Sequence, residues 1–122
     1  MTPLSDQELH NLAMNIAGKK LQDMGYEFVA VNSKLKKHPQ FVLFKKGEPT
    51  VFVLVQATNN IQNPNQYDKI WMETFVQHAK KQNASVWYAG VGLANAESVE
   101  MPVFKDHSYY VAFEDFVRIY EV

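Results

Sequence analysis

The apolar run from Val51 to Val55 constrains the fold of this chain more than any other segment. It belongs to the stretch Thr50–Thr58 (TVFVLVQAT) and has almost no alternation of polar and apolar residues. A strand with one face in water alternates, so a continuous run predicts a central strand covered on both faces. The fold therefore needs a layer of structure on each side of a sheet.

A helix with clear end signals is predicted over Ser5–Met24. Ser5 and Glu8 have the spacing of a capping box, which satisfies two backbone amide donors at a helix start. Gly25 marks the helix end, because glycine readily adopts the left-handed turn that follows a last helical residue. Apolar residues recur at spacings of three and four along one stripe, made of Leu9, Leu12, Ala13, Ile16, Ala17, Leu21 and Met24.

A second helix is predicted over Tyr67–Gln82, after helix-start signals at Pro64 and Asn65. Its apolar face would consist of Ile70, Trp71, Phe75, Val76 and Ala79. A helix between two strands suits a right-handed crossover that joins parallel neighbours in one sheet. This helix is therefore expected to connect Thr50–Thr58 with the next strand.

The other elements are predicted to be strands, since β-branched and aromatic residues dominate them. They are Tyr26–Asn32, Gln40–Lys45, Ser85–Leu93 and Tyr109–Phe113. Gly90 and Gly92 leave room for another segment to approach the backbone of their strand. The pattern of Glu114–Glu121 fits a short terminal helix and a last strand equally.

The predicted order is α-β-β-β-α-β, followed by one further strand and a short tail. Helices on both faces of a mixed sheet give a three-layer α/β (α+β) domain. The 122 residues suffice for one hydrophobic core but not for two, and no linker or repeat interrupts them. We expect one domain over residues 1–122.

The composition excludes several classes of protein. The chain contains no cysteine, which excludes disulfide scaffolds, thiolate zinc sites, iron–sulfur clusters and cysteine nucleophiles. Its net charge of -1 argues against a protein held to nucleic acid mainly by bulk charge. The first ten residues lack the pattern of a secretion signal, and no stretch approaches the ~18–20 apolar residues of a membrane span. A cytoplasmic protein without membrane contact is expected.

The succession of elements resembles the PD-(D/E)XK nuclease superfamily, whose restriction-endonuclease-like fold has an α-β-β-β-α-β core. The closest likeness is to small Holliday-junction-resolvase-like endonucleases of bacteria. The resemblance is carried by the passage from Ala17 through Leu21 and Gly25 to Asn32, and by the hairpin Gln40–Gln56. It covers the first half of the chain by residues and the second half by element order alone.

The resemblance implies a metal site whose ligands this chain lacks. In the superfamily, an Asp and a Glu on the second and third strands hold a metal, and a Lys two residues after the Glu helps to activate water. Phosphodiester hydrolysis needs a hard cation with oxygen ligands. These positions fall near Phe41, on Leu54 and on Gln56, and a helix acid of the resolvase-like group falls on Met14. The resemblance therefore implies a degenerate scaffold with no catalytic residue, metal or cofactor.

Other patterns supply no catalytic site either. Between Asp23 and Asp68 the only acidic residues are Glu27 and Glu48, both expected far from the third-strand site. The four histidines lack the i, i+4 pairing of a helical zinc site, and no HExxH motif occurs. They are expected to be surface or partly buried side chains.

Lysine is concentrated in the first half of the chain. The segment from Lys19 to Lys46 contains seven lysines and two acidic residues. The candidates for contact with phosphate or an acidic partner are Lys34, Lys36, Lys37, Lys45 and Lys46. Lysines on hairpins also keep edge strands from pairing with other chains. The chain has one arginine, Arg118, and arginine is the main reader of base edges. Nucleic acid is therefore a disfavoured partner.

Two features predict a binding surface. Gln56, Thr58, Asn59 and Asn60 follow the central strand, where they could hydrogen-bond a polar ligand or a peptide; equally, such residues form turns and caps. The aromatic side chains exceed what one small core can bury, and an exposed remainder would mark a protein–protein surface, commonly a dimer. The residues concerned are Trp71, Trp87, Tyr88, Tyr109 and Tyr110.

We therefore expect a non-catalytic cytosolic interaction module that acts by self-association or through a protein partner. The alternative is a metal-dependent nuclease, or a structure-selective DNA-binding protein, with relocated active-site residues. A third reading, a neutralising partner for a toxin, fits the small size and net acidity without a supporting motif.

Overall fold

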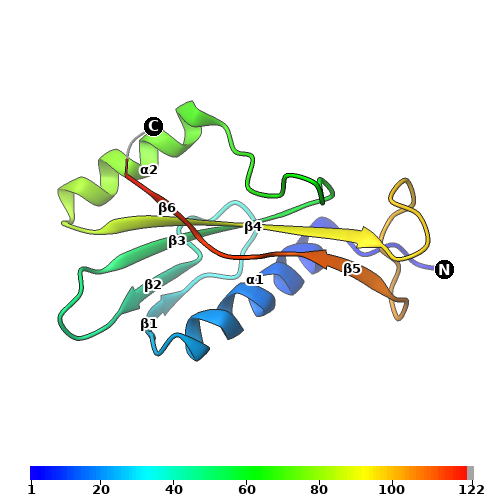
Figure 1. The fold of residues 1–122 in the computed structure, drawn as a ribbon, viewed down its shortest axis with the longest axis horizontal. Coiled ribbons are helices and arrows are strands. Elements are labelled where there is room, and N and C mark those ends of the chain that lie inside the picture. The colour runs from blue at the N-terminus through cyan, green and yellow to red at the C-terminus, as the bar shows by residue number, and fades with distance from the viewer. Residues whose placement is uncertain (121–122) are drawn as a thin grey trace.

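A helix covers each face of a mixed sheet in the computed structural model, which describes residues 1–120 (Figure 1). The helices are α1 (Asp6–Asp23) and α2 (Lys69–Lys81). The strands are β1 (Glu27–Val31), β2 (Phe41–Phe44), β3 (Val51–Thr58), β4 (Ser85–Asn95), β5 (Tyr109–Ala112) and β6 (Val117–Ile119). Neither helix of this part of the chain is long and apolar enough to cross a membrane. The predicted α+β class is confirmed.

The sheet has six strands and is mostly antiparallel. Five strands follow the order β1-β2-β3-β4-β5, and β3 and β4 are the parallel pair, in register from Val51 opposite Ser85 to Thr58 opposite Gly92. The helix α2 connects β3 to β4, as the crossover pattern predicted.

The segment after β5 forms a strand over Val117–Ile119, which resolves the ambiguous pattern of the tail. β5 pairs only with the last residues of β4, from Gly92 to Asn95. The same edge of β4 is therefore open from Val86 to Tyr88, and β6 pairs there. Residue 121, the end of the predicted tail element, lies outside the described residues.

β3 is buried on both faces, as its uninterrupted apolar run predicted. Val53 and Val55 belong to the core between the sheet and α1, while Leu54 belongs to the core between the sheet and α2. All three side chains are fully shielded from solvent. Successive strand residues point to opposite faces, so one apolar run fills both cores.

The ends of α1 follow the sequence signals. The Ser5 hydroxyl accepts a hydrogen bond from the Glu8 amide (3.1 Å), and the Glu8 carboxylate accepts one from the Ser5 amide (3.0 Å). After the helix, Gly25 has φ +88°, and the Tyr26 amide donates back to the Leu21 carbonyl. The buried face is rotated by about one residue from the predicted stripe, since it consists of His10, Ala13, Met14, Ala17 and Leu21.

The prediction for α2 is wrong in two details. The helix begins at Lys69 and not at Tyr67, because the Asp68 carboxylate caps it by accepting from the Trp71 amide (2.9 Å). Ile70 is 80% exposed, whereas Met72 is fully buried. The apolar stripe of this helix is broad, and only the packing of Met72 against the sheet decides which side of the stripe turns inward.

Candidate functional site

The four positions of the nuclease pattern do not form a site. Met14 and Phe41 are buried in the core on the α1 side of the sheet, and Leu54 is buried on the α2 side. Gln56 is half-buried at the carboxyl end of β3. Within residues 1–120, no group of three or more histidine, aspartate or glutamate side chains is placed to hold a metal ion. Met14, Phe41 and Leu54 belong to the two hydrophobic cores, whereas Gln56 belongs to neither.

Gln56 is engaged by a neighbour on the parallel strand. The Tyr88 hydroxyl donates a hydrogen bond to the side-chain oxygen of Gln56 (2.8 Å). Burial, with a smaller contribution from Tyr67, raises the pKa of Tyr88 to about 12. The phenol is therefore a permanent donor at neutral pH, and the Gln56 oxygen already has a partner.

The amide-rich segment after β3 forms a structured loop. The Thr58 hydroxyl accepts from the Asn60 amide (3.1 Å), and the Asn60 side chain accepts from the Asn63 amide (3.0 Å). Gln56, Thr58 and Asn60 line a shallow pocket of about 410 Å³ on the α2 side of the sheet, together with Asn63, Gln66, Tyr67 and Asp68. Three of the four predicted cleft residues thus meet there, while Gln56, Thr58 and Asn59 also line a second pocket.

The loop lies directly on the backbone of β4. The Gly90 amide donates to the Asn65 side chain (3.0 Å), and a Cβ atom at Gly90 would lie 1.8 Å from the Pro64 carbonyl oxygen. At Gly92 a Cβ atom would lie 3.2 Å from the Cα atom of Ile61. The prediction that these glycines admit a neighbouring segment is confirmed.

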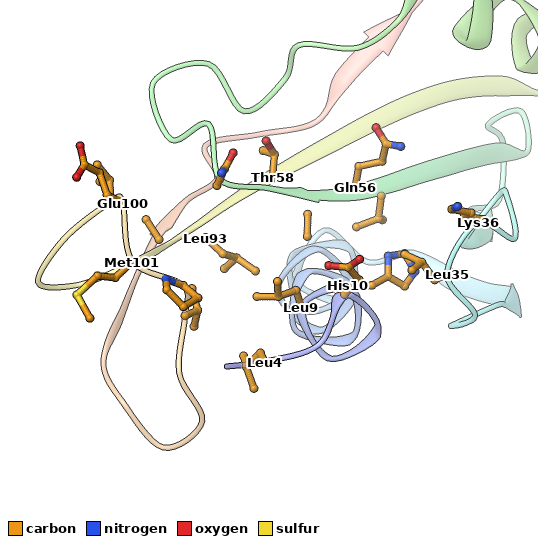
Figure 2. A pocket seen from close by; sticks show the side chains of 18 of the residues that line it. Leu4, Leu9, His10, Leu35, Lys36, Gln56, Thr58, Leu93, Glu100 and Met101 are labelled. Carbon is orange, nitrogen blue, oxygen red and sulfur yellow. The ribbon is translucent and has the colours of Figure 1, made fainter. Parts of the chain in front are cut away.

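A larger pocket of about 730 Å³ opens on the other face, between α1 and the carboxyl ends of β3 and β4. We call it the α1-side pocket; its apolar wall includes Leu4, Leu9, Val55, Leu93 and Val103. Figure 2 shows Leu4, Leu9 and His10 on this side of β3, whereas the side chains of Gln56 and Thr58 point away from it. Its residues come from six segments of the chain and include Gln56, Thr58 and Asn59 of the predicted cleft.

His10 forms part of the wall of the α1-side pocket. Its side chain is 2% exposed, and its Nε2 atom has no hydrogen-bond partner within the described residues. Burial, reinforced by His38, lowers the pKa of His10, so the ring is neutral at physiological pH. The expectation of a surface or partly buried histidine is wrong here, because position 10 lies on the same helix face as Ala13, Met14 and Ala17.

His38 lines the same pocket from the segment before β2. Its ring lies edge-on to Trp71 and Phe75 of α2, and burial lowers its pKa. The side-chain nitrogen of Gln40 lies 2.7 Å from its Nδ1 atom. His38 therefore ties the connection between β1 and β2 to the second helix.

Gln40 is a buried polar residue that the sequence reading missed. Its side-chain oxygen accepts from the Val55 amide of β3 (2.7 Å), and its side-chain nitrogen donates to the Lys37 carbonyl (3.0 Å). The Gln40 side chain thus adds one more hydrogen bond between the start of β2 and the strand β3, beyond the backbone pairs. The only local signal is an amide residue immediately before an apolar strand.

The acidic residues of the α1-side pocket are Asp6 and Glu100. Glu100 lies at the opposite end of the pocket from His10 and Lys36 in Figure 2. Because these charged and titratable groups are spread around the rim, they do not combine into a catalytic cluster. The pocket has the composition of a binding site: an apolar wall with separated polar groups.

The candidate basic residues are divided between the two ends of β2. Lys34, Lys36 and Lys37 precede the strand, whereas Lys45 and Lys46 follow it. The Lys45 ammonium donates to the Met24 carbonyl (2.9 Å) and lies 4.9 Å from the centre of the Tyr26 ring. The structure therefore places these five lysines in two separate groups, one of which is partly engaged within the protein.

The aromatic residues divide into a buried and an exposed group. Trp87 and Tyr88 are buried. Trp71 of α2 is half-buried against Phe75 and Tyr88. Tyr109 and Tyr110 are exposed on β5, at the edge of the sheet. Two of the five aromatic residues named in the sequence analysis are therefore exposed, both on β5; Phe44 on β2 and Tyr120 after β6 are exposed as well.

A family model described as "Domain of unknown function (DUF8840)" matches residues 7–119. The match spans nearly the whole chain, which belongs to this family. Neither the curated proteins nor the solved structures contain a significant match to the chain. A function must therefore be argued from the geometry of this structure.

Proposed function

We propose that this member of the DUF8840 family is a non-catalytic cytosolic interaction domain on a degenerate restriction-endonuclease-like scaffold, and that it acts by self-association through β5. The succession of α1, β1–β3, α2 and β4, with a helix on each face, supports the scaffold. The hydrocarbon at Phe41 and Leu54 supports the loss of catalysis, since neither side chain can bind Mg²⁺.

The observation that carries the proposal is the unprotected edge of β5. Tyr110 is 56% exposed, Tyr109 and Val111 are also exposed, and none of the residues in Tyr109–Ala112 is charged. Natural sheets protect their edges with charges, bulges, proline or very short strands, because a free edge invites pairing with another chain. β5 is short, at four residues, but it carries no charge, bulge or proline.

The other outer strands are protected. β1 has an irregular register between Phe28 and Ala30, and lysines follow it closely in the chain. β6 is only three residues long and carries Arg118, whose guanidinium lies 4.9 Å from the centre of the Trp87 ring. The contrast singles out β5 as the edge that accepts a partner.

The partner that best fits this edge is a second copy of the chain. An uncharged strand offers backbone hydrogen bonds and apolar contacts but no charge to attract a partner of opposite sign. Two copies of β5 that pair antiparallel about a twofold axis make each contact twice and continue the sheet from one protomer into the next. Such a dimer buries Tyr109, Tyr110 and Val111.

The test is the molar mass in solution of the whole chain and two lysine variants. Light scattering over a range of concentrations is expected to give twice 14.0 kDa for the wild type and 14.0 kDa for Val111→Lys. Val29→Lys is the matched control, because Val29 is 65% exposed on the opposite edge strand; it should remain dimeric. Far-ultraviolet circular dichroism checks that both variants fold.

A wild type that stays monomeric at every concentration would contradict the proposal. So would a folded Val111→Lys variant that remains dimeric, because a lysine in the pairing strand places two ammonium groups near the twofold axis. Loss of the dimer in Val29→Lys alone would place the interface on β1 instead.

A further inference from the structure

We infer that the α1-side pocket binds a neutral, mainly apolar small molecule whose single hydroxyl group pairs with Nε2 of His10. The inference does not depend on self-association through β5, which lies outside the wall of this pocket. It rests on the size and composition of the pocket, the unpartnered ring nitrogen, and the charges at the rim.

The pocket has the size and the wall of a small-molecule site. Its volume of about 730 Å³ falls within the range of roughly 300–1,000 Å³ found for ligand pockets. Aliphatic side chains from α1, β3, β4 and the segment before β5 form most of its wall, including Leu9, Val55, Leu93 and Val103. An apolar ligand would replace water against these surfaces.

The Nε2 atom of His10 requires a partner from outside the described protein atoms. Buried polar side-chain atoms are almost always hydrogen-bonded, because an unpaired buried group loses its interaction with water and gains nothing in exchange. Nε2 is unpaired and its ring belongs to the pocket wall, but the atom itself is shielded, so a ligand hydroxyl reaches it only when a neighbouring wall side chain shifts. A ligand group at the inner end of the pocket would supply the missing hydrogen bond.

The charges around the pocket select a neutral ligand with a hydroxyl group. The charged residues that line the pocket are two acids, Asp6 and Glu100, and one lysine, Lys36. Their net negative charge disfavours an anionic ligand. The ring of His10 is neutral, and its Nε2 atom is a donor or an acceptor according to the tautomer. A hydroxyl group serves both tautomers because it can donate and accept.

Three probes of the same shape test this assignment on the isotope-labelled wild-type protein: p-cresol, p-xylene and 4-methylbenzoate. We expect p-cresol to bind about five- to tenfold more tightly than p-xylene, which replaces its hydroxyl by a methyl group. 4-Methylbenzoate should bind most weakly. Nuclear magnetic resonance should show shifts of the His10 ring nitrogens and of the methyl groups of Leu9 and Leu93.

Two variants separate the hydrogen bond from the shape of the pocket. In His10→Leu the preference for p-cresol over p-xylene should disappear, while p-xylene still binds. His107→Gln is the control, because His107 is exposed and outside the pocket wall; its preference should match the wild type. If His10→Leu fails to fold, the comparison of probes on the wild type decides alone.

Equal affinities of p-cresol and p-xylene for the wild type would overturn the assignment. So would the absence of binding by both, or shifts confined to residues outside the pocket. These outcomes leave the molar-mass test untouched, because a monomer can bind the probes and a dimer can fail to bind them.

Discussion

The hydroxyl of Tyr88 on β4 donates a 2.8 Å hydrogen bond to the side-chain oxygen of Gln56 on β3. The two residues lie on the parallel pair of strands, with Tyr88 opposite Leu54 and Gln56 opposite Gly90. The contact therefore joins the central strand to its neighbour at the carboxyl end, beneath the loop over β4. Gln56 therefore has a structural role in this contact.

Tyr88→Phe should lower the free energy of unfolding by about 0.5–1.5 kcal/mol, the usual net value of one hydrogen bond. Gln56 is half-buried, so its freed oxygen can bind water and the loss stays at this level. Urea denaturation measures the change. A loss above about 3 kcal/mol would show that the hydroxyl organises more than this contact.

The same variant tests the ionisation of Tyr88. Its pKa of about 12 in the folded state is above the usual value of a tyrosine, so the unfolded chain releases this proton more readily. The stability contributed by the protonated phenol is therefore present below about pH 10 and is lost as the pH rises toward 12. Burial and Glu48 also raise the pKa of Tyr26, so ultraviolet absorbance titration should show late tyrosine ionisation that Tyr88→Phe reduces but does not abolish.

Gly90→Ala should destabilise the protein by about 3 kcal/mol or more. The new Cβ atom would lie 1.8 Å from the Pro64 carbonyl oxygen, so the loop must leave the strand. Gly47→Ala is the control: it has open space around it but a φ of +84°, which costs about 1–2 kcal/mol. Thermal denaturation compares them, and equal losses would show that the loop adapts without cost.

The buried histidines should make the protein less stable in mild acid. The pKa values of His10 and His38 are lowered in the folded state, so the unfolded chain binds more protons as the pH falls through about 6.5. Each histidine lowers the free energy of unfolding by up to about 1.4 kcal/mol per pH unit in this range. Urea denaturation between neutral pH and about pH 5 measures the slope.

Replacing His38 by phenylalanine should reduce that slope, because one of the two groups no longer binds a proton in the unfolded chain. A wild type whose stability rises toward pH 5 would contradict the conclusion that burial lowers the pKa values of His10 and His38. The carboxyl groups of Glu8 and Asp115 do not obscure the result: hydrogen bonds from Ser5 and from the Phe116 amide lower their pKa values, which places their titration at more acidic pH.

Divalent metal should leave the stability of the protein unchanged. A ligand that binds the folded state raises the melting temperature, and neither Phe41 nor Leu54 offers an oxygen atom to a cation. Millimolar Mg²⁺ or Mn²⁺ should therefore shift the melting temperature by less than about 1 °C. Branched and single-stranded DNA should remain uncleaved. A metal-dependent shift that Asp6→Asn or Glu100→Gln abolishes would revive the nuclease alternative with relocated acids.

Local signals were sufficient for the elements of this fold before the tail, whose pattern left helix and strand open. The start of α1 follows from Ser5 and Glu8 and its end from Gly25, because caps act within one helical turn. The central position of β3 follows from five successive apolar residues. The close approach at Gly90 was also predictable, since a glycine within a strand marks a place where another segment comes near.

The candidate sites depended on contacts between distant segments. The sequence by itself determined where α1 and β3 form, because periodicity and capping involve residues a few positions apart. Only the tertiary structure decided that His10 turns into the core, that β5 is the free edge, and that six segments enclose one pocket. Helix rotation and strand order are set by packing summed over both cores, and no short window of sequence contains that sum.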